Sequence, residues 1–426
     1  MYLKSIRIKD FKGIEEKTFY FNDNFNVIIG ENAVGKTSLL EAITIGLGAF
    51  MKGLYYVNGR SILKDDIRIL SYQSNIVRAM ESQIDLIAEI NREEYTWTRK
   101  RQSHAYLKDL ELYRNVFDLG QKLAKESKSG RFITLPLISF YGTGRLLKEN
   151  DSKFNPANTE YRIDGYNKAL NPNSNYKTLL SWFKETEISV YKSGKGIDAL
   201  KSVKRAVRNS FDEIETLYYD ERIDALSIIL KENGKGIKAE SKPLSTLSDG
   251  QKVLIGLMGD IALRCNLLNP LAEENANDMT PGIVLIDELD LHLHPNWQRK
   301  IVSILKETFP KIQFIVTTHS PFIIQSLKNE ELIDLQEKEL DTDYFNKSIE
   351  EISIEEMGVD TRRSLQFQKM MNLAYLYFKK INEPISTENT IEIQQLKSEL
   401  NSFEEMFNED PGFVALLKIE REIKGL

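Results

Sequence analysis

The chain has 426 residues, of which 41% are hydrophobic and 28% charged, close to the averages of soluble globular proteins. No stretch of the sequence approaches the roughly 18 apolar residues of a membrane-spanning helix, and the start, MYLKSIRIKDFKG, lacks the apolar centre of a secretion signal. The single cysteine, Cys265, excludes an internal disulfide framework, so we expect a cytoplasmic protein without membrane spans of its own.

The first thirty residues alternate between apolar and polar side chains, which predicts strands in YLKSIRIKDF, KTFYF and FNVIIG. After Gly30, the spacing of Leu39, Leu40, Ala42 and Ile43 is helical. A strand therefore runs into a helix at this point, and the junction carries the first motif.

That junction, GENAVGKT, matches the pattern G-x-x-x-x-G-K-[ST] of a P-loop in the strand-to-helix context that the motif requires. Gly30 and Gly35 let backbone N–H groups curl round phosphates, and the helix start adds a positive dipole end. Lys36 would bridge the β- and γ-phosphates of ATP, and the hydroxyl of Thr37 would bind Mg²⁺. With Ser38, these residues form the predicted nucleotide site.

Further along, SQIDLIAEI and YTWTRKR predict a strand pair around a turn at Asn91–Glu93, and TLPLISFYGTGR predicts a buried strand. Residues from Glu149 to Asn175 are rich in Asn, Asp, Ser and Pro, which favours loops. The spacing of apolar residues then predicts a helix over residues 197–217, and its apolar face contains Leu200, Val203, Val207, Phe211 and Ile214.

Four cations line the flank of that predicted helix: Lys201, Lys204, Arg205 and Arg208. They fit either a solvated helix surface or a stripe that contacts a nucleic-acid backbone without reading bases. Direct contact with nucleic acid is left open at this point.

Residues RIDALSIIL and GIKAES predict a hairpin that leads into LSDGQK, at the start of a long helix. Ser248, Gly250 and Gln251 lie at the N-terminus of that helix, where a hydroxyl, exposed amides and the helix dipole favour a γ-phosphate. The stretch differs at one residue, Asp249, from LSGGQ, the signature of ATP-binding-cassette (ABC) ATPases. Because the chain already has its own P-loop, the signature serves the nucleotide of a second copy, so two chains would enclose two ATP molecules.

Two short apolar stretches, GIVLIDELD and KIQFIVTTHSP, predict strands buried on both faces of a sheet. Asp287, at the end of the first strand, would hold Mg²⁺ as a Walker B aspartate does, and Glu288 would orient and polarise the attacking water. His319, at the end of the second strand, would sense the γ-phosphate. His292 and His294 have the spacing of a metal-binding pair. They closely follow Asp290, however, in the loop that crosses the subunit boundary in ABC-type ATPases, so we do not expect them to bind a metal.

The C-terminal part is acidic and predicted to be helical, with 22 Asp and Glu against 11 Lys and Arg after Asn329. Its apolar residues need a covering surface, which is either the rest of the chain or a partner protein. They comprise Leu365, Met370, Leu373, Tyr377 and Phe378, and further on Phe407, Phe413, Leu416, Leu417 and Ile423.

The motifs FKGIEE, GENAVGKTS, LSDGQ, LIDELDLHLHP and VTTHSPF resemble those of the ABC-type heads of SMC, RecF and OLD proteins. The resemblance implies an α/β P-loop ATPase head with a helical insertion and a C-terminal helical segment. It also implies that Lys12 and Asn32 approach the nucleotide. We expect the head to span residues 1–335, with insertions at about 50–130 and 146–240, followed by an acidic helical region at 336–426.

A closer resemblance, to the PtuA-type ATPases of Septu and some retron antiphage systems, covers nearly the whole chain. It rests on LISFYGTGRLL, ELDLHLHPNWQR, the SIEEI and MGV stretches and FNEDPGFVALLKIER. This family implies a homodimer or higher homo-oligomer that works beside a separate HNH nuclease, PtuB. In related heads, the loop after the strand LISFY carries a glutamine near the γ-phosphate; here Arg145 lies in that loop, and its role is open.

Three readings follow from the sequence. The first is a dimeric ATPase that regulates a nuclease in phage defence. The second is a RecF-like DNA-repair ATPase that acts directly on DNA. The third, a scaffold that binds ATP without turning it over, is disfavoured by Glu288, because a scaffold has no need of a water-polarising carboxylate.

Overall fold

The computed structural model describes residues 1–31, 34–54, 59–72, 75–104, 109–129, 133–145, 162–172, 176–231, 241–336, 344–358, 365–381 and 392–400. The chain divides into two units, Met1–Met357 and Gly358–Leu426, each with its own hydrophobic core. Among the described residues, no helix is long and apolar enough to span a lipid bilayer.

A five-stranded parallel sheet forms the centre of the first unit, in the order β14-β3-β13-β12-β8. Its strands are β3 (Phe25–Ile29), β8 (Leu137–Tyr141), β12 (Gly282–Ile286), β13 (Ile312–Thr317) and β14 (Leu332–Asp334). All residues of β3, β8, β12 and β13 are buried, as expected of strands covered on both faces. The four strands predicted here from their apolar runs are confirmed.

A second, antiparallel sheet has the order β2-β1-β6-β7. Its strands are β1 (Tyr2–Phe11), β2 (Ile14–Tyr20), β6 (Glu81–Ile90) and β7 (Glu93–Gln102). The predicted strand pair around residue 91 is confirmed, and Asn91 and Arg92 both have positive φ, as in the two-residue turns of tight hairpins. Strand β6 pairs with β1 on one edge and with β7 on the other, so this part of the 50–130 region completes the sheet that β1 and β2 begin.

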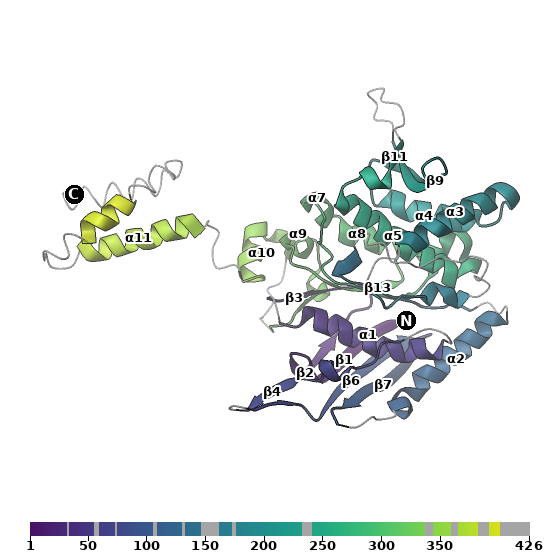
Figure 1. Cartoon of the computed structure of the whole chain (residues 1–426), viewed down its shortest axis with the longest axis horizontal. Helices are drawn as coiled ribbons and strands as arrows, with labels where there is room; N and C mark the ends of the chain where they lie inside the picture. The colour runs from purple at the N-terminus through teal and green to yellow at the C-terminus, as the bar shows by residue number, and fades with distance from the viewer. Residues whose placement is uncertain are drawn as a thin grey trace. The chain divides into compact units, whose positions relative to one another are not determined.

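Helix α1 (Lys36–Gly53) lies between these two sheets (Figure 1). It is buried nearly all round, and the indole Nε1 of Trp97 on β7 donates a hydrogen bond to the carbonyl of Gly46, 2.9 Å away. Helix α2 (Arg114–Lys128) packs against α1, and the strands β4 (Ile69–Tyr72) and β5 (Asn75–Arg78) form a separate hairpin. The helix that follows the P-loop is therefore held rigidly on both sides.

On the opposite face of the parallel sheet lie α3 (Tyr176–Ser193), α4 (Ile197–Asn209) and α5 (Asp249–Leu268) (Figure 1). The helix predicted over 197–217 is wrong beyond Asn209, because the chain turns at Ser210 and Ile214 opens a strand. That strand, β9 (Ile214–Asp220), pairs with β10 (Ala225–Leu230), and β10 pairs on its other edge with β11 (Ser241–Pro243). Most of the predicted partner GIKAES lies outside the described residues.

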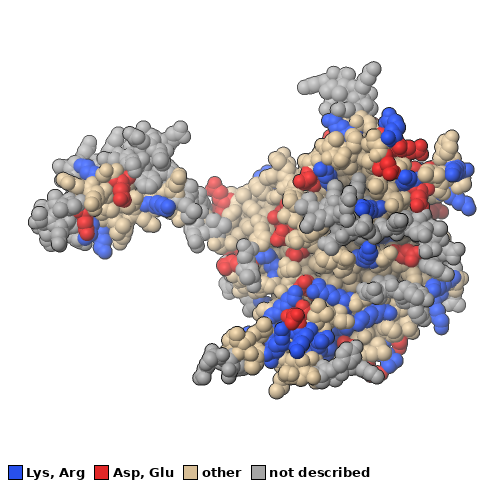
Figure 2. Space-filling view, in the orientation of Figure 1, with Lys and Arg blue, Asp and Glu red and all other residues tan. Residues whose placement is uncertain are grey.

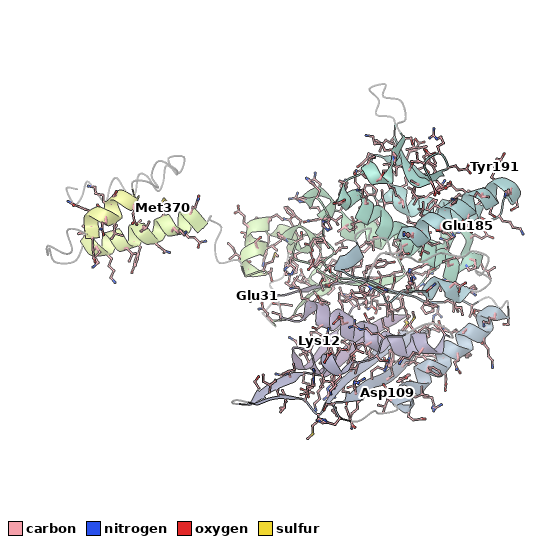
Figure 3. The ribbon with its side chains drawn as sticks, viewed as in Figure 1. Lys12, Glu31, Asp109, Glu185, Tyr191 and Met370 are labelled. Carbon is pink, nitrogen blue, oxygen red and sulfur yellow. The ribbon has the colours of Figure 1, made fainter. Side chains whose placement is uncertain are left out.

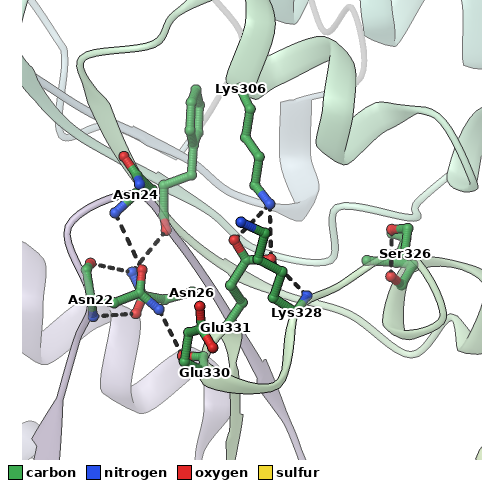
Figure 4. A network of polar contacts seen from close by, with 10 residues as sticks. Asn22, Asn24, Asn26, Lys306, Ser326, Lys328, Glu330 and Glu331 are labelled. Carbon is green, nitrogen blue, oxygen red and sulfur yellow. Dashed lines mark hydrogen bonds and ion pairs between the residues drawn. The ribbon is translucent and has the colours of Figure 1, made fainter. Parts of the chain in front are cut away.

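Short helices complete the first unit: α6 (Ala276–Met279), α7 (Pro295–Gln298), α8 (Ile301–Thr308), α9 (Pro321–Ile324) and α10 (Ile349–Glu355). Near α8, polar contacts tie the β2–β3 turn to the loop before β14 (Figure 4). There the side-chain amide of Asn22 donates to the carbonyl of Glu330 at 2.7 Å, and the ammonium of Lys306 contacts the carboxylate of Glu331 at 2.6 Å. These contacts fix the sheet edge beside β3.

In the second unit, α11 (Leu365–Ile381) packs against a helix at residues 392–400. Met370, Ala374, Tyr377 and Leu400 are its buried apolar residues, with Leu373, Ile381, Ile393 and Leu396 packed against them. The apolar face predicted for this part is therefore covered at least in part by the unit itself. The second predicted apolar set, from Phe407 to Ile423, lies outside the described residues.

Candidate nucleotide site

The P-loop follows β3 and ends at α1, as its sequence predicts. Gly30 and Gly35 have φ values of +147° and +110°, a backbone region that only glycine adopts without strain. Lys36 is 8% exposed, and its ammonium donates hydrogen bonds to the carbonyls of Gly30 at 2.7 Å and Glu31 at 2.9 Å, so it lies against the first residues of the loop. Ser38 lies in the first turn of α1, and Asn32 lies outside the described residues.

Thr37 and Asp287 meet at the carboxyl edge of the parallel sheet. The hydroxyl of Thr37 donates to Oδ2 of Asp287 at 3.0 Å, and Asp287 is 4% exposed. A carboxylate and a hydroxyl from two different elements form an oxygen-donor pair that suits Mg²⁺, which binds one or two carboxylates together with substrate phosphates. These residues fit the predicted metal role, and they would place the ion beside the P-loop.

Thr317, at the end of β13, links the two acidic residues that follow β12. Its hydroxyl donates to Oδ1 of Asp287 at 2.7 Å and accepts the backbone N–H of Glu288 at 2.7 Å. Glu288 also has a positive φ of 50°, uncommon for a residue other than glycine. Both oxygens of Asp287 and the backbone of Glu288 are thus oriented by hydroxyl groups.

Asp290 organises the end of β13 in a similar way. Its Oδ1 accepts the hydroxyl of Thr318 at 2.6 Å and the backbone N–H of His319 at 3.2 Å. Because β12 and β13 are parallel neighbours, His319 and Glu288 emerge at the same edge of the sheet. The sequence motifs identified His319 but missed Thr317, Thr318 and the role of Asp290; the signal was a pair of hydroxyl residues at the end of an otherwise apolar strand.

The electrostatics of this edge follow from its burial. Burial lowers the pKa of Lys36, while the carboxylates of Asp287, Glu288 and Asp290 oppose that shift. A cation and three carboxylates therefore converge where the P-loop meets the strand ends, and phosphates with a divalent ion would complete their charge balance.

Lys12, predicted by resemblance to approach the nucleotide, lies after β1 (Figure 3). Its ammonium contacts the carboxylate of Glu41 on α1. Glu41 also accepts a hydrogen bond from Arg60 at 3.1 Å, and Asp66 lies 3.8 Å from the ammonium of Lys12. Burial lowers the pKa of Lys12. Figure 2 shows Lys and Arg side chains gathered over this part of the head, with carboxylates among them.

The signature helix α5 begins at Asp249, with Ser248 as its N-cap. The Ser248 hydroxyl accepts the N–H of Gln251 at 3.4 Å, and the side-chain oxygen of Gln251 accepts the N–H of Ser248 at 3.1 Å, a reciprocal capping box. A Cβ on Gly250 would lie 2.3 Å from the carbonyl of His292, so the signature packs directly on the loop after β12. Since α1 and α5 lie on opposite faces of the parallel sheet, the P-loop and the signature belong to different sides of the head (Figure 1).

The predicted basic stripe on α4 is largely paired with acidic residues. Lys204 contacts Glu187 at 2.8 Å, and Arg205 forms an ion pair with Asp278. Lys201 lies within 4 Å of two carboxylates. These pairings favour an ordinary solvated surface for this flank. The side chain of Arg145, in the loop after β8, lies outside the described part of the molecule.

A P-loop between β3 and α1, facing an acidic strand end across a parallel sheet, defines a P-loop nucleotide-binding head. The family model "AAA domain, putative AbiEii toxin, Type IV TA system" matches residues 25–325, and the chain belongs to this family. The predicted α/β fold class and the predicted relationship to the retron and Septu PtuA-type ATPases are both confirmed.

Individual relatives cover most of the chain. It is 28% identical to the "Retron Vc95 probable ATPase" of Vibrio cholerae over 78% of this chain and 72% of the relative. It is 25% identical to the "Septu protein PtuA" of Bacillus thuringiensis over 85% of this chain and 86% of the relative. A RecF protein of Bacillus cytotoxicus is 47% identical over 45 residues, or 11% of this chain and 12% of that protein. Among solved structures, the SMC head domain from Thermotoga maritima is 19% identical, with a TM-score of 0.43 over 78% of this chain and 94% of that chain.

Proposed function

We propose that this chain is the ATPase of a retron- or Septu-type antiphage defence system, which binds ATP with Mg²⁺ between two copies and hydrolyses it. The observation that carries the proposal is the contact between Thr37 and Asp287, which joins the P-loop to the acidic strand end. Similarity to a retron ATPase and to a Septu protein over most of the chain supports the biological setting.

Each site residue has a distinct task in this proposal. Lys36 and the backbone N–H groups of the P-loop hold the phosphates, and Thr37 and Asp287 hold the metal ion, which neutralises phosphate charge. Glu288 accepts a proton from the attacking water and orients it, since its backbone is fixed by Thr317. His319 donates a hydrogen bond to the γ-phosphate.

The second copy follows from the position of the signature. Ser248 and the N-terminus of α5 are exposed on the face of the head opposite to α1, so they would contact the nucleotide of a partner copy. Each chain has one P-loop and one signature, so a symmetric dimer satisfies both. ATP would then hold the dimer together, and hydrolysis would release it.

The partner that this dimer regulates is proposed to be a separate HNH-type nuclease, as the resemblance to PtuA-type ATPases implies. The main alternative, a RecF-like ATPase acting directly on DNA, is supported by a local similarity over 45 residues, and the ion pairs of Lys204 and Arg205 on α4 do not favour DNA binding at that flank. An HNH nuclease gene adjacent to the gene for this chain would support defence, whereas a replication cluster would support repair.

The direct test combines ATP turnover, size and partner capture with the full-length chain. We expect Mg²⁺-dependent ATP hydrolysis, an ATP-dependent shift from one copy to two in size measurements, and co-purification of the neighbouring nuclease. Lys36→Ala should abolish nucleotide binding and the size shift. ATP-independent dimerisation together with tight, salt-sensitive DNA binding would instead favour the repair function.

A further inference from the structure

Three buried polar side chains join the signature helix to the end of strand β8. Tyr141, Asp260 and Arg264 are 6%, 5% and 4% exposed. The Tyr141 hydroxyl donates to Oδ2 of Asp260 at 2.7 Å, and Nε of Arg264 donates to the same oxygen at 2.8 Å. Burial, and then the nearby Asp260 carboxylate, raise the pKa of Tyr141 well above its usual value, so the phenol keeps its proton and acts as the donor.

This cluster reaches three parts of the head. Its acid and its cation lie on α5, where Asp260 follows Asp249 by 11 residues, about 16 Å along a helix. Arg264 also donates to the carbonyls of Gly165 at 2.7 Å and Asn167 at 3.2 Å, in the turn beside β8. None of these contacts involves a residue of the P-loop.

Tyr141 has a second, independent link to the acidic strand end. Its backbone carbonyl accepts the N–H of Asp287 at 2.8 Å, and it pairs with Ile286 in the parallel ladder. Gly142 follows at once, and the chain then leaves the sheet in the turn Thr143–Arg145. One residue thus binds Asp287 through its backbone and the signature helix through its side chain.

A buried ion pair is a costly way to stabilise the packing of a helix on a sheet, because well-packed apolar residues of similar volume are often as stable or more so. Such a cluster does, however, fix a single relative position of the elements it joins. An α-helix moves nearly as a rigid body, so a displacement of the N-terminus of α5 is transmitted to Asp260 and from there to Tyr141.

We propose that Tyr141, Asp260 and Arg264 are positioning residues that couple the signature helix to the catalytic strand end. Contact of Ser248 with the partner's nucleotide thereby sets the position of Asp287 and Glu288 in the same chain. This inference rests on the proposed function, since it presupposes an ATPase dimer, and it adds to that function a route by which each signature controls hydrolysis in its own subunit.

The test compares two tyrosine variants that remove the same atom. Tyr141→Phe deletes the hydroxyl that binds Asp260. Tyr166→Phe deletes an equally buried hydroxyl, which donates to the carbonyl of Pro136 at 2.6 Å and takes no part in the cluster. Both substitutions should lower the melting temperature by similar amounts, because each removes one buried hydrogen bond.

The two variants should differ in turnover. For Tyr141→Phe we expect the Kd for ATP to stay within about twofold of the wild type, while kcat falls about tenfold, an ordinary size for coupling between sites. Tyr166→Phe should keep the wild-type kcat. Equal kcat values for the two variants at saturating ATP would overturn the proposal and leave the cluster a structural feature of the core.

A second variant covers the case in which Tyr141→Phe does not fold. Arg264→Lys keeps a cation beside Asp260 but removes the guanidinium, which also donates to the carbonyls of Gly165 and Asn167. We expect the same loss of kcat at an unchanged Kd for ATP. Wild-type kcat in Arg264→Lys would equally count against the coupling. If the wild-type chain itself neither hydrolyses ATP nor dimerises, the proposed function fails first, and this outcome is distinct from an active wild type with unaffected variants.

Discussion

At the scale of single residues, the hydroxyl of Thr317 orients two groups of the proposed catalytic site. It fixes both a carboxylate oxygen of Asp287 and the backbone of Glu288. Thr317→Val keeps the shape of the side chain but removes both of these buried hydrogen bonds, at about 1–3 kcal/mol of stability. We expect kcat to fall by about tenfold or more, because general-base catalysis depends on exact placement of the base.

Thr308→Val provides the matched control. Thr308 on α8 is 4% exposed, and within the described structure its hydroxyl has no hydrogen-bond partner. Its replacement by valine should leave both the melting temperature and turnover nearly unchanged. A Thr317→Val protein as active as Thr308→Val would show that the hydroxyl bridge has no part in hydrolysis.

Glu288→Gln tests the assignment of the catalytic base. The substitution keeps the phosphate and metal contacts but removes the carboxylate that accepts the proton from water, so we expect ATP to bind and the closed dimer to persist. Size-exclusion chromatography with and without ATP measures this. Hydrolysis at the wild-type rate by Glu288→Gln would assign the base to another residue.

At the scale of elements, two helices of the head begin with the same capping box. Ser248 pairs with Gln251 at the start of α5, and Ser348 pairs with Glu351 at the start of α10. Replacing either serine by alanine should cost about 1 kcal/mol of stability. Only Ser248→Ala should also weaken ATP-dependent dimerisation, because only α5 is proposed to face the partner's nucleotide. Equal effects of the two variants on dimerisation would reduce Ser248 to a helix cap.

The sequence predicted the central elements well because their signals are local. The apolar runs of β12 and β13 cannot be solvated, and a P-loop between a strand and a helix fixes the neighbouring topology. The predicted helix over residues 197–217 was wrong after Asn209 because Phe211 and Ile214 continue a helical spacing, whereas pairing with β10 decides the structure there. That pairing is made with the next strand along the chain, so the spacing of residues within 197–217 does not show it.

The candidate site shows the same division. Lys36, Thr37, Asp287 and His319 were found from motifs, and the structure brings them to one edge of the sheet. Their geometry rests on partners such as Thr317, which comes from a different strand and shares no motif with the residues it orients. The cluster around Asp260 was missed for the same reason, since a polar residue in a helix reads as a surface residue until its burial is known.

At the scale of the whole molecule, the division after Met357 refines the test of partner docking. A chain ending at Met357 retains the complete first unit, so we expect normal ATP binding and dimerisation, with loss of the co-purifying nuclease if the second unit carries the docking surface. Gel filtration, ATP turnover and a pull-down measure the three properties. Full retention of the nuclease by this shorter chain would place docking on the head.

A chain ending at Pro384 is the informative comparison. It keeps α11 but removes Ile393, Leu396 and Leu400, which cover Met370, Ala374 and Tyr377. We expect this chain to aggregate more than the one ending at Met357, because it exposes an apolar helix face. If it stays as monodisperse as the full chain, the α11 face does not depend on residues 392–400 for its cover.

The close packing of Gly250 against His292 also decides where the protein can be tagged. Any side chain at position 250 would collide with a backbone carbonyl, whereas the Asp249 side chain is 67% exposed. The only native cysteine, Cys265, is buried, and burial raises the pKa of its thiol to about 12, so it does not react with maleimides under ordinary conditions. A fluorophore attached through Asp249→Cys would therefore be the single label on the chain and would lie beside the signature residues. Its emission would report each encounter between two heads in real time.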